Sequence, residues 1–170
     1  MHAVPLIYFR TATPLDITTL KKIDSMTGKN EKSCTYPIFM IGPENSLIFH
    51  YRDGGSGNGN EIYNVYDYKN KKWSRLLETP LIDGKGKMNA YMSGPTLGSD
   101  GWFHLCWVWR DSPDCSTNHH PSYARSRNLT QWETIDGKGL KLPITFDNKE
   151  TIFDPIPVGG GIINGVLNTA

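Results

Sequence analysis

The chain has 170 residues and a formal net charge of +1. This balance argues against a protein that coats nucleic acid or another polyanion by bulk charge, so an anionic ligand would need a local site. Aromatic residues make up 11% of the chain and glycines number 17, which favours a β-rich, turn-rich fold. No run approaches the roughly 20 apolar residues of a membrane span, and no signal peptide is visible.

Short apolar runs predict strands near residues 4–9, 36–41, 46–52, 61–67, 88–92, 102–109, 121–125 and 151–153. Turn-forming residues separate these runs, above all in the glycine-rich segments 53–60 and 83–86 and in segment 112–118. The helix-compatible stretch around Ile17 to Lys22 is short enough for a single turn. The chain is therefore predicted to be all-β.

Two segments carry the same residues in the same order. The first contains Gly42-Pro43, Phe49, Tyr51-Arg52-Asp53, Tyr66, Trp73 and Ile82-Asp83-Gly84-Lys85-Gly86, and the second contains Gly94-Pro95, Phe103, Trp109-Arg110-Asp111, Tyr123, Trp132 and Ile135-Asp136-Gly137-Lys138-Gly139. A period of roughly 50 to 60 residues with short strands and tight turns is typical of one propeller blade. We expect the two arginine triplets to occupy equivalent strands of adjacent blades.

The length of the chain limits the number of blades. At this period it holds about three, whereas closed propellers have roughly four to eight. We predict a partial β-propeller within one domain, with blades at residues 36–87 and 88–150 and partial blades at 1–35 and 151–170. The chain is thus expected to be a piece of a larger gene product, and an open stack would leave apolar sheet faces without partners.

Further segments carry a family resemblance along nearly the whole chain. They are residues 1–6, 34–37, 51–59, 89–91, 103–110, 117–119, 122–126 and 161–164. In order and spacing they resemble the BNR-type seven-bladed propellers that include ulvan lyases, of which about half a member is covered. The resemblance implies a secreted or periplasmic lyase that cleaves an anionic, uronate-containing polysaccharide by β-elimination. The alternatives are an α-L-rhamnosidase acting on rhamnose-glucuronate linkages and a non-catalytic glycan-binding propeller.

Elimination beside a uronate carboxylate needs a group that neutralises the carboxylate, a base for the C5 proton and an acid for the leaving oxygen. Arg52 suits the first task, because a guanidinium binds a carboxylate bidentately. Tyr36 suits proton transfer, since a nearby cation can lower the pKa of a phenol, and His2 offers a further donor. The resemblance carries these catalytic roles onto Tyr36, Arg52 and His2, and implies substrate contacts for Asn89, Tyr91, Arg110 and Asn118.

Structural roles for the same residues remain open. Tyr36 precedes Pro37 and would suit a blade edge, and Arg52 has a counterpart in Arg110, so that each arginine could stabilise a turn with the aspartate that follows it. The glycine-rich segment after Arg52 favours function, because it lets a ligand approach the backbone. The resemblance also places a second catalytic histidine upstream of the first residue, so the chain alone is expected to be nearly inactive.

A second group of residues has the composition of a zinc site. His104 and Cys106 are expected on one face of a strand, and Cys115 and His119 follow in the next segment, so that two thiols and two imidazoles are predicted within one hairpin's reach. The resemblance also implies zinc in this region. Alternatively, Cys106 is a small buried hydrophobe and His119 a loop residue bonded to backbone. Three cysteines exclude a complete disulfide framework, and no organic cofactor is expected.

Overall fold

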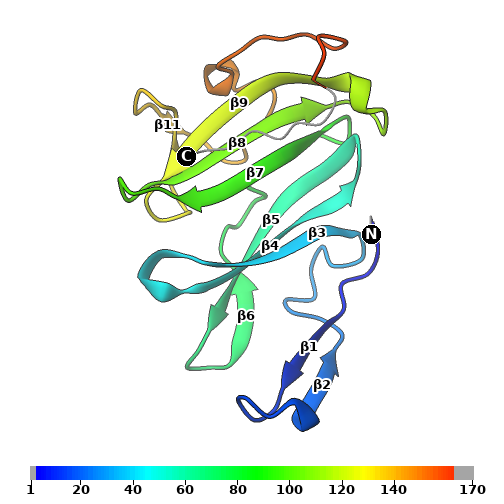
Figure 1. Ribbon diagram of the computed structural model, residues 1–170, viewed down its shortest axis with the longest axis vertical. Coiled ribbons are helices and arrows are strands. Elements are labelled where there is room, and N and C mark those ends of the chain that lie inside the picture. Colours follow the sequence, from blue (N-terminus) through cyan, green and yellow to red (C-terminus); the bar gives the residue numbers. More distant parts are fainter. Residues whose placement is uncertain (1–2, 163–170) are drawn as a thin grey trace.

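The computed structural model describes residues 3–162, and these form three antiparallel sheets (Figure 1). A hairpin of β1 (Tyr8–Thr11) and β2 (Leu20–Ile23) precedes two larger sheets. The first, here blade 1, has the strand order β3 (Cys34–Ile41), β4 (Leu47–Gly55), β5 (Asn58–Asp67), β6 (Lys72–Arg75). The second, blade 2, contains β7 (Asn89–Leu97), β8 (Phe103–Arg110), β9 (Asn118–Ser126), β10 (Trp132–Glu133) and β11 (Gly139–Leu140). The prediction of an all-β partial propeller is confirmed.

Helical structure within residues 3–162 is confined to single 3-10 turns. These are η1 (Ile17–Thr19), η2 (Pro43–Asn45), η3 (Cys115–Thr117) and η4 (Lys149–Thr151). None of them is long or apolar enough to cross a membrane. The helical turn predicted at residues 17–22 is correct for residues 17–19, which form η1, but residues 20–22 belong to strand β2.

The predicted repeat is confirmed at the two arginine triplets. Arg52 and Arg110 both lie on the second strand of a blade, and each is paired with a residue of the first strand, Thr35 for Arg52 and Asn89 for Arg110. The Gly-Pro part of the repeat was wrong. Gly42-Pro43 follows β3, whereas Gly94-Pro95 lies inside β7, where the pairing with β8 is irregular.

Three segments differ from the strand prediction. A strand was expected at residues 4–9, but β1 begins at Tyr8, and Val4 forms an isolated bridge with Cys34. Residues 53–60 were expected to be a loop, but β4 and β5 continue through them and leave only Ser56-Gly57 as a turn. Glycines have no side chains to show a strand pattern, and the pairing partner compensates for their low propensity. Residues 151–153 were expected to be a strand, but they contain the end of η4 and one isolated bridge between Ile152 and Ser122.

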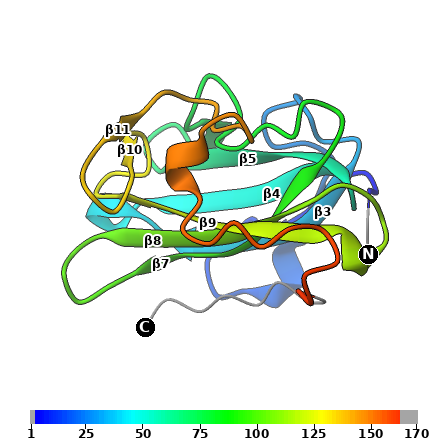
Figure 2. The same cartoon turned by 90° about the horizontal axis from the view of Figure 1, so that it is seen from above.

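The main core lies between the two blades, which stack face to face (Figure 2). Blade 1 contributes Ile48 and Tyr63, and blade 2 contributes Leu105, Trp107 and Trp109, all nearly inaccessible to solvent. Because side chains alternate along a strand, Arg52 shares the face of β4 with Ile48, so it is directed toward blade 2. The interface between the blades therefore holds the predicted catalytic arginine.

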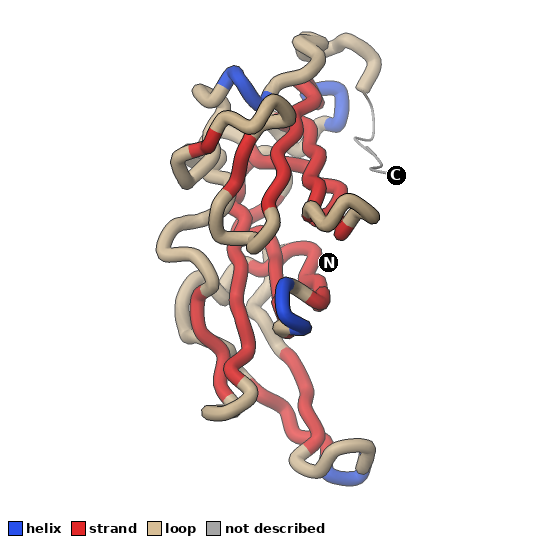
Figure 3. Tube along the Cα trace, turned by 90° about the vertical axis from the view of Figure 1, so that its left-hand side faces the viewer, coloured by secondary structure: helices blue, strands red, loops and turns tan. Residues whose placement is uncertain are grey.

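The opposite face of blade 1 is only partly covered. Phe49, Tyr51 and Trp73 form a second cluster there with Leu6 of the N-terminal segment. The β1–β2 hairpin extends away from this cluster at one end of the molecule (Figure 3). Phe39 packs its ring against Phe49 and yet remains 53% exposed. An incompletely covered apolar face is what the open blade stack predicted.

Candidate active site between the blades

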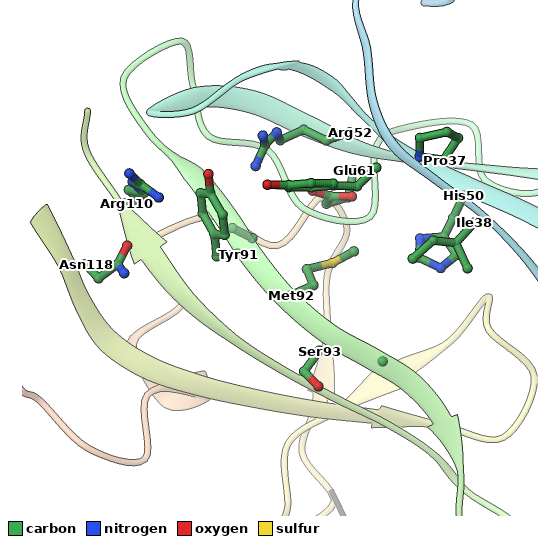
Figure 4. A pocket seen from close by; sticks show the side chains of 13 residues that line it. Pro37, Ile38, His50, Arg52, Glu61, Tyr91, Met92, Ser93, Arg110 and Asn118 are labelled. Carbon is green, nitrogen blue, oxygen red and sulfur yellow. The ribbon is translucent and has the colours of Figure 1, made fainter. Parts of the chain in front are cut away.

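A cavity of about 710 Å³ lies at the junction of the two blades (Figure 4). Strands β3, β4 and β5 of blade 1 form one wall, and β7, β8 and β9 of blade 2 form the other. The residues that line it are Tyr36, Pro37, Ile38, His50, Arg52, Glu61, Ala90, Tyr91, Met92, Ser93, Gly94, Arg110 and Asn118. Five of the predicted site residues, Tyr36, Arg52, Tyr91, Arg110 and Asn118, are thus brought together.

Arg52 presents an unpaired positive charge to this cavity. It is only 2% exposed, and its Nε and Nη2 donors have no hydrogen-bond partner. Within residues 3–162 it forms no ion pair. Gly59 makes room for its stem, since a Cβ there would lie 2.7 Å from the Cγ and Cδ of Arg52. A buried guanidinium with free donors costs stability, and an anion that enters the cavity would compensate it.

Tyr36 is directed toward the cavity by an irregularity in β3. The pairing of β3 with β4 shifts between Thr35 and Ile38, and Tyr36 adopts a φ of 51°. Such a conformation is uncommon for a bulky residue, and a bulge of this kind re-aims a side chain. The Tyr36 ring packs edge-on against Tyr91, with 6.3 Å between centroids. The strained backbone therefore positions the predicted catalytic phenol.

Tyr91 lies between two arginines, one from each blade (Figure 4). The Cζ of Arg52 is 4.9 Å from the centroid of its ring and the Cζ of Arg110 is 4.6 Å from it. Its hydroxyl forms a 2.7 Å hydrogen bond with Ser56 Oγ. Arg110 is itself held by the carbonyl oxygens of Ser112 and Pro113. The two arginines, which occupy equivalent strands of the repeat, thus lie on either side of the Tyr91 ring.

The pKa values of the two phenols shift in opposite directions. Burial would raise the pKa of Tyr91, but the hydrogen bond with Ser56 and the charges of Arg52 and Arg110 together lower it. Desolvation, the neighbouring Tyr91 and a hydrogen bond with Tyr91 raise the pKa of Tyr36, despite the same two arginines. The two arginines lower the pKa of Tyr36, but desolvation and Tyr91 outweigh them, so the expectation of a net lowering is wrong.

One further predicted residue, Asn89, lies outside the cavity. Asn89 is fully buried but does not line the cavity; its amide oxygen accepts a hydrogen bond from the N–H of Gly57 and its Nδ2 donates to the carbonyl of Ala90. It thus fastens the β4–β5 turn of blade 1 to β7 of blade 2. His2 lies outside the described residues.

Two buried ionisable residues on the wall were not anticipated. Glu61 lies opposite Arg52 on β5, and burial raises its pKa to about 8 against the charge of Arg52. His50 stacks on Tyr63 with 5.0 Å between centroids, and burial lowers its pKa to about 4. The sequence signal that could have located Glu61 is the Ser56-Gly57 dipeptide. If this dipeptide is taken as a two-residue hairpin turn, the resulting register places Arg52 opposite Glu61.

The four predicted zinc ligands do not converge. His119 pairs with Trp109, five residues beyond His104 on β8, which is about 17 Å along the strand. His104 instead bonds Tyr123 and Asp100, and His119 bonds Asp111 and His120. Cys106 is buried, and Cys115 lies in η3 at the far end of the β8–β9 hairpin from His104. Within residues 3–162 no group of three or more metal-binding side chains is assembled.

The physical reason is the register of the hairpin. Each residue of the hairpin faces its own register partner: His104, near the start of β8, pairs with Arg125, whereas Cys115 and His119 lie near the turn at the other end. The proposed closed Cys2His2 site therefore does not fit this structure. Zinc binding elsewhere in the protein stays a prediction.

The fold and the site define a class of protein: a blade-repeat β-protein whose inter-blade cavity is lined by two buried arginines and two tyrosines. The chain matches the BNR repeat-containing family over residues 1–169 and belongs to that family. It is 28% identical, over 145 residues, to the short isoform of ulvan lyase from Alteromonas sp. (strain LOR), covering 77% of this chain and 28% of that relative.

Solved structures show the same fold. The crystal structure of the polysaccharide lyase Uly1 superposes with a TM-score of 0.63 at 23% identity, covering 85% of this chain and 33% of that one. A PL25 ulvan lyase bound to -[GlcA(1-4)Rha3S]- superposes with a TM-score of 0.62 at 13% identity, covering 84% of this chain and 34% of the other. The chain thus spans about a third or less of the length of these relatives.

Proposed function

We propose that this chain contributes the catalytic cavity of a polysaccharide lyase that cleaves a uronate-containing, ulvan-like glycan by β-elimination. The observation that carries the proposal is Arg52, a buried guanidinium whose Nε and Nη2 are unpaired at the wall of a cavity large enough for sugar rings. A uronate carboxylate is the ligand that such a cation binds best. The ulvan lyase relative supports the choice of substrate.

The proposed reaction assigns a task to each side chain. Arg52 and Arg110 neutralise the uronate carboxylate, which makes the C5 proton acidic. Tyr91, whose pKa is lowered, takes that proton in its phenolate form, and the electrons of the C5–H bond form the C4–C5 double bond. The C4–O bond breaks, and Tyr36, whose pKa is raised, donates its proton to the leaving oxygen. Proton transfer from Tyr91 back to Tyr36 through their hydrogen bond restores the starting state.

The composition of the cavity wall favours elimination over glycoside hydrolysis. Hydrolysis by most glycosidases needs two carboxyl groups on either side of the bond. Among the described residues, Glu61 is the one acidic side chain that lines the cavity. The rhamnosidase alternative therefore has no observation in its favour. Because a polysaccharide does not cross a membrane unaided, we also propose an extracytoplasmic location, which cell fractionation would test.

Turnover of ulvan by the full-length gene product to which this chain is expected to belong, followed by the ultraviolet absorbance of the unsaturated uronate product, tests the proposal. Tyr36→Phe should lower kcat by about 100-fold or more while substrate still binds, because it removes the proton donor. Arg52→Ala should weaken both binding and turnover, because the carboxylate loses its partner in ground and transition states.

Leu15→Ala, at a fully exposed side chain, provides the control and should match the wild type. Full activity of Tyr36→Phe would refute the assigned role. Release of free rhamnose without unsaturated product would refute the lyase.

A further inference from the structure

A buried carboxyl group shares the cavity wall with the unpaired guanidinium. Glu61 is 4% exposed and lies directly opposite Arg52 in the pairing of β4 with β5 (Figure 4). Its backbone N–H donates to the carbonyl of Ile82, and its own carbonyl accepts from the N–H of Leu81, so both sides of its peptide are held. Within residues 3–162 its carboxyl group forms no hydrogen bond or ion pair. Its backbone is therefore fixed, and its carboxyl group is buried without a hydrogen-bond partner in the described part of the chain, next to the positive charge of Arg52.

The charge balance of the cavity depends on this residue. Arg52 presents two unpaired donors to the cavity, and a bound uronate would occupy them. An ionised Glu61 would place a second carboxylate beside Arg52 in a desolvated space, repel the uronate and compete with it for Arg52. A neutral Glu61 leaves both free donors of Arg52 available.

We propose that Glu61 controls access of anionic sugars to the site: the cavity accepts a uronate only while the carboxyl group of Glu61 carries its proton. This inference rests on the proposed function, because it takes a uronate as the ligand. Burial supports it, since burial raises the pKa of Glu61 to about 8 despite the charge of Arg52. A bound uronate raises that pKa further, so that binding and protonation are linked.

The other ionisable groups around Glu61 can be separated from it. Burial lowers the pKa of His50 to about 4, so His50 stays neutral where Glu61 titrates. Burial raises the pKa of Tyr63 well above its usual value and that of Cys34 to about 12. The pKa of Tyr91 is lowered, so a Tyr91→Phe variant is needed to separate the titration of Tyr91 from that of Glu61. The ionisable groups that share the cavity wall with Glu61 are His50 and Arg52 from β4, Tyr36 from β3, Tyr91 from β7 and Arg110 from β8. Tyr63, on the same face of β5, and Cys34, from the cluster on the opposite face, also interact with Glu61 electrostatically.

Calorimetric titration of a short oligosaccharide with the repeat GlcA(1-4)Rha3S tests the proposal between about pH 6 and pH 10. We expect the wild-type Kd to be constant below about pH 8 and to rise by up to about tenfold per pH unit above it, with uptake of up to about one proton per bound sugar. Glu61→Gln keeps the size of the side chain without its charge, so both effects should disappear. Glu78→Gln, at an exposed site, should behave as the wild type, and Tyr91→Phe should keep the pH dependence.

Each alternative outcome has a distinct meaning. A wild-type Kd that does not change with pH, or one that changes equally in Glu61→Gln, overturns the proposal, as does loss of the dependence in Tyr91→Phe. If Glu61→Gln fails to fold, the number of protons that the wild type takes up on binding is measured instead, by calorimetry in two buffers of different ionisation enthalpy. Absence of proton uptake overturns the proposal. Failure of the oligosaccharide to bind at any pH contradicts the proposed function itself, whereas binding without pH dependence contradicts only the role of Glu61.

Discussion

Replacement of Arg52 by methionine is expected to stabilise the protein while it abolishes ligand binding. The guanidinium is buried, and two of its donors are unpaired. Each buried unpaired donor costs about 1–3 kcal/mol. Methionine has a stem of similar length that can occupy the space beside Gly59, and it removes both donors and the charge.

The gain is reduced by lost ring contacts. The Cζ of Arg52 lies 5.2 Å from the Tyr36 centroid and 4.9 Å from that of Tyr91, and each such contact contributes about 0.5–2 kcal/mol. Two donors at about 2 kcal/mol each, less two contacts at about 1.2 kcal/mol each, leave a net gain of about 1–2 kcal/mol. For a chain of this size that gain raises Tm by about 2–8 °C.

Thermal unfolding followed by circular dichroism measures this shift, and oligosaccharide titration confirms the loss of binding. Arg52→Lys is the matched control, because it keeps a buried charge and should not raise Tm. A Tm of Arg52→Met below that of the wild type would refute the reasoning, since it would mean that the guanidinium stabilises the empty site. An equal rise in both variants would show that charge is not the cause.

Two further predictions concern the contact between the blades and the metal. Gly57→Ala should destabilise the protein by about 2 kcal/mol or more in urea unfolding, because Gly57 has a φ of 77° and a Cβ there would lie 2.7 Å from the backbone nitrogen of Ser112 in blade 2. Gly55→Ala, with open space around it, should be nearly neutral, and equal effects would contradict this explanation. Removal of metal ions by a chelator should leave the Tm unchanged, because the side chains of His104 and His119 are hydrogen-bonded to other partners; a clear fall in Tm would restore the zinc expectation.

The architecture could be predicted because the blades repeat and their central strands are rich in aromatic residues. The Arg-Asp pairs at the ends of β4 and β8 keep their order, and they mark equivalent strands. The short strands β6 and β10 could not be found in this way. Lys72–Arg75 and Trp132–Glu133 carry little pattern of their own, and they are extended because β5 and β9 pair with them.

The site was predictable in part for a related reason. Residue type and resemblance identified Tyr36, Arg52, Tyr91 and Arg110, but the role of a side chain depends on the register that the chain adopts. One missed turn at Ser56-Gly57 concealed the position of Glu61 opposite Arg52. The direction of the pKa shift in Tyr36 depends on its desolvation and on its distance from Tyr91 and the arginines, which no sequence pattern encodes.

The equivalence of Arg52 and Arg110 has an evolutionary consequence. Tandem duplication of a blade copies every surface residue once, and at the junction it brings the two copies close together. A single arginine at the end of a second strand therefore becomes, after one duplication, a pair of cations on either side of the Tyr91 ring. Later divergence of the two copies would be free to tether one arginine, as Ser112 and Pro113 tether Arg110, and to leave the other with unpaired donors, as in Arg52.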